Sequence, residues 1–185
     1  MTITQLNYVD CSRDNSSLTP ESVVSLYKTV TENLIAKRLS VSTMESCTSG
    51  LISSLLTCIE GSSQVLKGAF VTYCNEAKIQ QGVPREIIEK YGVYSQQTAY
   101  NMANACRKAY DADIGIGITG TASNADTHNS DSVSNVVYAV ISTDRYIFAY
   151  RFNTPEIRDR FQWKLVVARY LGEQLLKIFT KENVL

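Results

Sequence analysis

Histidine is nearly absent from this chain. His128 is the one histidine among 185 residues, and it lies in the polar segment SNADTHNSDS. Such a segment is typical of a surface loop, so a triad of serine, histidine and aspartate is not expected. One histidine and scattered carboxylates also provide no ligand cluster with a recognisable metal spacing. The sequence therefore predicts chemistry that needs neither a metal nor another cofactor.

Net charge and long apolar runs are absent as well. Eighteen basic residues balance eighteen acidic ones, so no net field gathers nucleic acid or an anionic membrane. No apolar run approaches the ~18 residues that a bilayer-spanning helix needs. We therefore expect a soluble protein with no nucleic-acid partner and no membrane partner.

The chain also lacks the cysteine pattern of a disulfide framework or a redox pair. Its cysteines are odd in number and include no C-x-x-C pair, and the first residues lack the basic and apolar regions of a signal peptide. These two features indicate a protein of a reducing compartment, and we therefore expect a cytoplasmic location. The five cysteines are Cys11, Cys47, Cys58, Cys74 and Cys106.

Helical and strand patterns alternate along the rest of the chain, which is long enough to form one domain with its own core. Residues 1–18 are polar and without period, which predicts a flexible arm. Thr19, Pro20 and Glu21 then form a helix start. Strands are expected at Val41–Met44, Gly68–Tyr73, Asp113–Gly120, Ser132–Thr143 and Arg145–Phe152, with Gly68–Tyr73 buried. Helices are expected at 19–39, 51–59 and 83–92, after Ser95, and from about Pro155 onward.

This order predicts an α/β fold, a three-layer α/β/α sandwich with a mixed central sheet in a single domain. The sheet is mixed because the last two strands form a hairpin around Asp144 and must be antiparallel. We expect the folded domain to occupy residues 19–181, followed by a short tail at 182–185.

Sites in such sheets gather beyond the carboxyl ends of the strands. Three stretches have that placement: ESCTSG (45–50), YCNEAK (73–78) and TGTA (119–122). In the first, the hydroxyls of Ser46 and Thr48 either cap the following helix or supply a nucleophile. Cys47 competes for the role of nucleophile, although a lone cysteine is often a small buried hydrophobe. Lys78 is the candidate base, provided that burial keeps it neutral; otherwise it is a solvated surface charge.

Five segments, taken in order, resemble the CinA C-terminal family of competence/damage-inducible proteins, which includes nicotinamide mononucleotide deamidase. They are ESCTSG, YCNEAK, GVPREIIEKYGVYS, MANACR and ADIGIGITGTA, and the resemblance extends from about Thr19 to Phe179. It implies a stand-alone copy of this domain, without the molybdopterin-binding-like domain to which it is fused in longer relatives.

The resemblance also implies a reaction. Family deamidases hydrolyse the carboxamide of nicotinamide mononucleotide to nicotinate mononucleotide and ammonia without a metal. The family serine matches Ser46 and the family lysine matches Lys78, which implies a Ser-Lys dyad with a pyridine mononucleotide as the small-molecule substrate. Whether the protein forms a homo-oligomer is left open by the sequence. The implied substrate-binding positions are the turn residues Cys47, Thr48, Ser49 and Gly50, whose backbone N–H groups would hold an oxyanion, together with Tyr73, Thr119, Gly120 and Arg158.

The chain departs from the family pattern in three places, one of which is the segment FNTPE (152–156), where relatives carry a G-D-R run before the last helix. The family turn usually carries two glycines where this chain has Ser49 and Gly50, and a glycine- and proline-rich loop is replaced by residues 123–134. Arg158 also has a second interpretation, as an exposed charge in a first helical turn. Two hypotheses remain: an amidohydrolase, or a catalytically silent member that binds a nucleotide or a protein partner.

Overall fold

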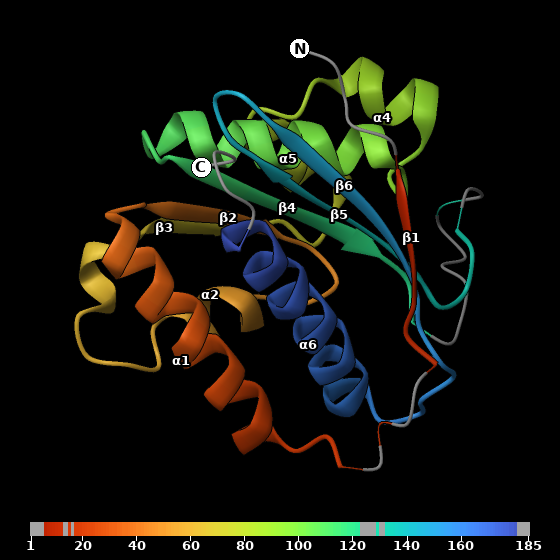
Figure 1. Cartoon of the computed structure of the whole chain (residues 1–185). Coiled ribbons are helices and arrows are strands. Elements are labelled where there is room, and N and C mark those ends of the chain that lie inside the picture. Colours follow the sequence, from red (N-terminus) through yellow and green to blue (C-terminus); the bar gives the residue numbers. More distant parts are fainter. Residues whose placement is uncertain (1–5, 13–14, 16, 123–128, 130–131, 181–185) are drawn as a thin grey trace.

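The computed structural model describes residues 6–12, 15, 17–122, 129 and 132–180. These residues form one mixed sheet with helices on both faces (Figure 1). The strands are β1 (Asn7–Asp10), β2 (Val41–Glu45), β3 (Leu66–Val71), β4 (Ile114–Gly120), β5 (Val136–Ser142) and β6 (Ile147–Asn153). The helices are α1 (Pro20–Lys37), α2 (Leu51–Leu56), α3 (Asn75–Gln80), α4 (Arg85–Tyr91), α5 (Gln96–Ala109) and α6 (Arg160–Phe179), with a short 3-10 helix at Ser62–Gln64.

The strand order is β1-β6-β5-β4-β2-β3. Strand β5 runs antiparallel to both of its neighbours, whereas β2 runs parallel to β3 and β4, and β1 runs parallel to β6. Helices α1, α2 and α6 cover one face of the sheet, and α4 and α5 lie on the other (Figure 1). The three-layer α/β/α architecture with a mixed sheet is thus confirmed, including the antiparallel hairpin of β5 and β6.

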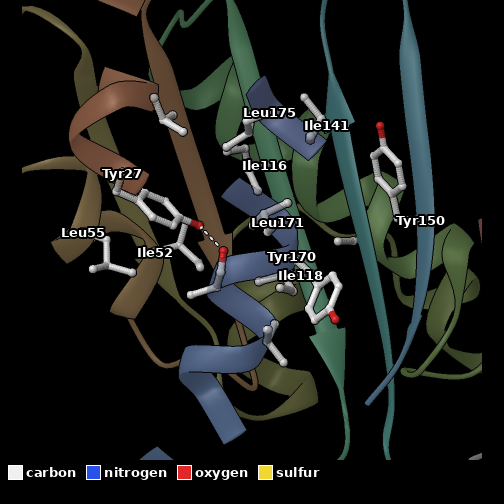
Figure 2. Close-up of a cluster of buried hydrophobic side chains, with 14 of the residues drawn as sticks. Tyr27, Ile52, Leu55, Ile116, Ile118, Ile141, Tyr150, Tyr170, Leu171 and Leu175 are labelled. Atoms are coloured by element: carbon white, nitrogen blue, oxygen red, sulfur yellow. Dashed lines mark hydrogen bonds between the residues drawn. The ribbon is translucent and has the colours of Figure 1, made fainter. Parts of the chain in front are cut away.

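The face beneath α1, α2 and α6 holds the larger core. Apolar side chains of β4 pack there against the two long helices (Figure 2). The buried Tyr27 of α1 donates its hydroxyl to the carbonyl oxygen of Ala168 in α6, 3.0 Å away, which satisfies its polar end inside this core. Residues labelled in this cluster include Ile52, Leu55, Ile116, Ile118, Leu171 and Leu175.

The opposite face is packed by a close approach of backbones. A Cβ placed on Gly115 or Gly117 of β4 would lie 2.1 Å from a carbonyl oxygen of α5, that of Ala103 or Ala99 respectively. Such contacts are impossible for any side chain, so α5 can lie this close to the sheet only over glycine. The pattern DIGIGITG therefore brings α5 down onto the middle of the sheet.

Local capping signals confirm several of the predicted helix starts. Thr19 accepts a hydrogen bond from the Ser22 N–H at 3.2 Å, and Ser22 Oγ accepts one from the Thr19 N–H at 3.1 Å, which makes a reciprocal cap for α1. Ser95 caps α5 through the Thr98 N–H at 3.1 Å. Because these bonds join neighbours in the sequence, short motifs were enough to predict them.

The N-terminal arm differs from the expectation. Residues Asn7–Asp10 form β1, an edge strand that pairs in parallel with β6. Its side chains are mostly exposed, so they show no alternation by which a strand would be recognised. Backbone pairing with β6 creates the strand, and that partner lies about 140 residues away in the sequence.

Two further expectations were wrong in detail. Strand β3 is an edge strand with half-exposed side chains rather than a buried one, since only β2 flanks it. The last helix begins at Arg160 rather than near Pro155, because Asp159 caps it by accepting from the Gln162 N–H at 2.8 Å.

Other expectations are not tested by the described part of the chain. His128 and most of the segment 123–134 lie outside the described residues, as does the tail at 182–185. Among the described residues, each helix is too short or too polar to serve as a membrane span. The cytoplasmic location and the assembly state stay predictions.

Candidate active site

The carboxyl ends of β2, β3 and β4 meet at one edge of the sheet. Beyond β2, the Ser46 N–H donates to the Ile118 carbonyl oxygen of β4 at 3.1 Å, and the Thr72 N–H donates to the Glu45 carbonyl oxygen at 2.8 Å. These bonds extend the parallel pairing on both sides of β2. As a result, the three turns singled out from the sequence lie together.

The first two turns bring Ser46 and Lys78 into contact. Lys78 Nζ lies 3.0 Å from Ser46 Oγ and donates a second hydrogen bond to the Thr72 carbonyl oxygen at 2.8 Å. Both side chains are buried, with Lys78 only 1% exposed. Residues that are 32 positions apart in the chain therefore form one hydrogen-bonded unit.

Lys78 is a buried amine, and no ion pair neutralises it within the described part of the chain. None of the salt bridges found among the described residues includes it, and its two acceptors are a hydroxyl and a carbonyl, both uncharged. Burial disfavours the ammonium and lowers the pKa of Lys78 from 10.5 to about 8. With a pKa of about 8, roughly a tenth of this side chain is neutral at pH 7, and this neutral form can accept a proton from Ser46.

Cys47 is adjacent in sequence but has different surroundings. Its side chain is partly buried and packs against the large core cluster. Burial, reinforced by the negative charge of Glu45, raises the pKa of the Cys47 thiol to about 12. The thiol is thus protonated at neutral pH, which makes it a poor competitor for the role of nucleophile.

Glu45 is the residue of this turn that the sequence analysis missed. It is fully buried, and its carboxylate accepts hydrogen bonds from the N–H groups of Gly50, Ile52 and Ser53 at 3.0, 3.1 and 2.9 Å. The Thr48 hydroxyl donates to it at 2.7 Å, and the Thr43 hydroxyl at 3.3 Å. Of the two interpretations of the Ser46 and Thr48 hydroxyls, the helix cap does not hold, because Glu45 caps α2.

A signal for this cap was present in the sequence. Gly50, the N-cap residue of α2, has no side chain with which to cap, so another acceptor is required. The nearest acid is Glu45 at the end of β2, and it reaches around the turn to the helix.

The backbone N–H groups of the turn are unequally available. Those of Ser49 and Gly50 are occupied, by the Ser46 carbonyl oxygen at 3.1 Å and by Glu45. Those of Cys47 and Thr48 have no partner among the described residues. A donor that is already bonded inside the protein is not free for a ligand, so the amides of Ser49 and Gly50 do not fit the expected oxyanion role, and those of Cys47 and Thr48 stay the candidates for it.

Ser49 and Gly50 have the backbone conformation that glycine favours. Ser49 has φ of 53° and Gly50 has φ of 89°, both in the left-handed region. A Cβ on Gly50 would lie 3.4 Å from Val71 Cγ2, which is near contact. Ser49 is exposed, so its side chain meets no obstacle, but its positive φ costs about 1 kcal/mol relative to glycine.

At the end of β4, Thr119 is buried and Gly120 is packed closely. The Thr119 hydroxyl donates to the Val93 carbonyl oxygen at 3.1 Å, which ties β4 to the segment between α4 and α5. A Cβ on Gly120 would lie 2.5 Å from the Val136 carbonyl oxygen. The Ser46 N–H donates to the carbonyl oxygen of Ile118, the residue before Thr119, so the end of β4 lies next to the first turn.

Tyr73 follows β3 at this edge and is exposed, and of the two arginines near the start of α6 Arg160 contacts it. Tyr73 is 63% exposed, and Arg160 Nη2 donates to its hydroxyl at 3.4 Å. Arg158 is exposed and precedes α6, so it is not in the first helical turn. Arg158 makes no hydrogen bond or ion pair with another described residue. Arg160, which the sequence analysis did not consider, is the arginine that contacts Tyr73.

One described residue of the altered loop also reaches the site. Asn129 Oδ1 accepts a hydrogen bond from Asn75 Nδ2 of α3 at 3.2 Å. Since α3 also carries Lys78, this bond places Asn129 beside the helix that holds the amine.

Comparison with known proteins gives one family. The model of the CinA C-terminal domain matches residues 23–172. A CinA-like protein of Flavobacterium psychrophilum is 36% identical over 149 residues, which cover 79% of this chain and 34% of that protein. A putative competence-damage inducible protein of Clostridium perfringens is 35% identical over 161 residues, covering 85% of this chain and 39% of that protein. The chain thus spans about a third of the length of these relatives.

Solved structures give the same result. The crystal structure of a competence/damage inducible protein from Agrobacterium tumefaciens superimposes with a TM-score of 0.78 at 28% identity, covering 89% of this chain and 99% of that one. A CinA superfamily protein from Escherichia coli has a TM-score of 0.77 at 25% identity, covering 86% of this chain and 92% of that one. Both structures match over nearly their whole length.

Proposed function

We propose, from the premise that this chain belongs to the CinA C-terminal domain family, that it is a metal-independent amidohydrolase. The proposed substrate is nicotinamide mononucleotide, which water converts to nicotinate mononucleotide and ammonia. The observation that carries the proposal is the contact of 3.0 Å between Lys78 Nζ and Ser46 Oγ, made by a buried amine without an ion-pair partner among the described residues. We assign the activity to one domain at residues 19–181.

In the first step, neutral Lys78 accepts the hydroxyl proton of Ser46 while Ser46 Oγ forms a bond to the carboxamide carbon. The carbonyl oxygen becomes an oxyanion, and the open N–H groups of Cys47 and Thr48 are the proposed donors to it. Collapse of this intermediate breaks the carbon–nitrogen bond. Lys78 returns its proton to the leaving nitrogen, which departs as ammonia.

In the second step, water replaces ammonia. Lys78 takes a proton from the water as its oxygen attacks the acyl carbon, and the bond to Ser46 Oγ breaks. The proton then returns to Ser46, and the carboxylic acid leaves as nicotinate mononucleotide. The dyad is restored and no metal or redox partner is consumed.

Tyr73 and the two arginines support a nucleotide substrate. Tyr73 offers an exposed aromatic ring beside the turn, and Arg160 contacts its hydroxyl. Arg158 adds a second exposed guanidinium just before α6, and guanidinium groups suit phosphate. Thr119 and Gly120 are proposed to border the reacting end of the substrate, since they end the strand whose Ile118 accepts a hydrogen bond from the Ser46 N–H.

A catalytically silent binding protein is the second candidate. The segment 123–134 has no glycine, and it adds Asp126 and Asp131 where relatives carry a glycine-rich loop. Negative charge near a phosphate opposes binding, although solvent screens much of it. This observation favours a different ligand or none.

Ammonia release from nicotinamide mononucleotide tests the proposal. We expect turnover by the native chain and none by Ser46→Ala, with nicotinate mononucleotide formed in equal amount to ammonia. Binding measured by calorimetry without turnover would favour the silent candidate instead. Absence of both binding and turnover would remove this substrate.

A further inference from the structure

Glu45 and Ser46 are consecutive, and the structure uses them on opposite sides of β2. The Glu45 carboxylate is bonded to α2 on one side of the sheet, whereas Ser46 Oγ meets Lys78 of α3 on the other. Successive side chains of a strand point to opposite faces, so this division follows from the strand geometry. A change at Glu45 therefore acts on Ser46 through the backbone.

The carboxylate of Glu45 also determines how the turn distributes its N–H groups. It takes the amides of Gly50, Ile52 and Ser53, while the Leu51 N–H bonds to the Thr48 carbonyl oxygen at 3.2 Å. The N-terminal amides of α2 are thus used inside the protein and not offered to a ligand. The two open amides belong to Cys47 and Thr48, immediately after the serine.

We propose that Glu45 is a positioning residue for the reaction, which holds the turn so that the N–H groups of Cys47 and Thr48 face the oxyanion. This inference rests on the proposed serine mechanism. Glu45 contacts no reacting atom itself. It acts through the backbone that it anchors at Gly50, Ile52 and Ser53 and through the hydroxyl of Thr48.

A carboxylate suits this task for a chemical reason. All five groups around Glu45 are donors, and an ionised carboxylate is a pure acceptor with room for about four or more such bonds. A glutamine of the same shape would turn its own N–H₂ group toward at least one of these donors. The turn would then have to move to separate the facing donors, and the Cys47 and Thr48 amides would move with it.

The first experiment compares kcat and KM for nicotinamide mononucleotide in the native chain, Glu45→Gln and Glu45→Asp. We expect Glu45→Gln to lower kcat about 100-fold with KM changed less than about threefold, since displaced oxyanion donors affect the transition state more than the ground state. Glu45→Asp keeps the charge, so we expect it to lose less than Glu45→Gln. The pH at which activity is half-maximal is expected to stay unchanged in both variants, because the burial of Lys78 sets it.

Thr19→Ala is the matched control. It removes the cap of α1, far along the chain from the turn, and so weakens the fold without touching the site. Native-like kcat in Thr19→Ala, beside a large loss in Glu45→Gln at a temperature where both are folded, supports positioning. Equal losses in the two variants, or native kcat in Glu45→Gln, would overturn it.

The second experiment needs no Glu45 variant and no nucleotide. Amide hydrogen exchange of the native chain is expected to be slow at Gly50, Ile52 and Ser53 and fast at Cys47 and Thr48. Labelling Ser46 with diisopropyl fluorophosphate displaces fluoride and places a phosphoryl oxygen where the oxyanion would lie. Slower exchange at Cys47 and Thr48 after labelling supports the inference, and unchanged exchange there in the labelled protein contradicts it.

These two experiments separate the inference from the substrate assignment. If the native chain releases no ammonia from nicotinamide mononucleotide but Ser46 is labelled and the two amides become protected, the positioning role stands and the substrate is wrong. If Ser46 is not labelled at all, the serine mechanism fails, and the role of Glu45 in it fails too.

Discussion

The two sides of the end of β2 bury two ionisable groups in opposite ways. On the α2 side, Glu45 is surrounded by five hydrogen-bond donors from the turn, the helix and Thr43. On the α3 side, Lys78 has two neutral acceptors and forms no ion pair among the described residues. The carboxylate is well compensated for its burial, whereas the amine is poorly compensated.

This difference separates a group that organises the fold from one suited to chemistry. A buried charge with a full set of partners stabilises one local conformation. A buried amine with few partners loses its proton easily, which is what a general base needs. Variants that change one group of this site at a time test the difference.

The largest effect is expected at the serine. Ser46→Ala should lower amidase activity about 1000-fold or more, because Ser46 supplies the hydroxyl that Lys78 contacts. Cys47→Ala should keep most of the activity, since its thiol is protonated. Steady-state assays on both variants check this, and the opposite ranking would replace the serine mechanism by a cysteine mechanism.

Lys78→Met should abolish activity and change how stability depends on pH. Folding lowers the pKa of Lys78 from 10.5 to about 8, so between these values the unfolded chain binds more protons and native stability rises with pH. Relative to Lys78→Met, the native chain should gain about 1–3 kcal/mol from pH 7 to about pH 10.

Urea unfolding of both proteins across this range measures the difference. Lys28→Met is the control, because Lys28 is exposed and forms only a surface pair with Glu32. Parallel stability curves for the native chain and Lys78→Met would show that Lys78 is not titrating with a lowered pKa.

The pH dependence of kcat/KM should show a smaller, related effect. Only neutral Lys78 accepts the serine proton, so activity should rise with pH and level off above about pH 8, the pKa of this side chain. A change of about tenfold is expected from one pH unit below this value to the plateau. Activity that falls over the same range would mean that the protonated amine is required.

The smallest effect is expected at Ser49. Ser49→Gly should stabilise the fold by about 0.5–1 kcal/mol, because φ of 53° is easier for glycine than for serine. The gain is reduced by the larger entropy of glycine in the unfolded chain. Thermal unfolding checks it, with Ser53→Gly inside α2 as a control that should lower stability.

Local patterns predicted much of the fold. The caps at Thr19 and Ser95, the hairpin around Asp144 and the order of strands and helices depend on residues that are neighbours in the chain. Strand β1 was missed because it depends on β6, a distant partner, and its own side chains are exposed. Sequence periodicity reports burial, so it says little about an edge strand whose side chains are mostly exposed.

The residues of the candidate site also divide into those that local patterns predicted and those that depend on distant partners. Ser46 and Lys78 were singled out from their turns, and the structure brings them together. The role of Glu45 was missed although glycine at the N-cap of α2 calls for another acceptor, because Glu45 lies in β2 and reaches the helix N–H groups only around the folded turn. Arg160 was missed because its approach to Tyr73 depends on where α6 packs.

The sequence by itself determined all the strands but β1, the layered α/β arrangement and the residue types available for chemistry, since these depend on propensity, periodicity and local capping. Only the tertiary structure decided which amides stay open, which carboxylate caps α2 and how deeply Lys78 is buried. The physical reason is that hydrogen-bond partners and desolvation depend on the neighbours in space. Those neighbours come from β2, β3, β4 and α3, which meet only when the chain has folded.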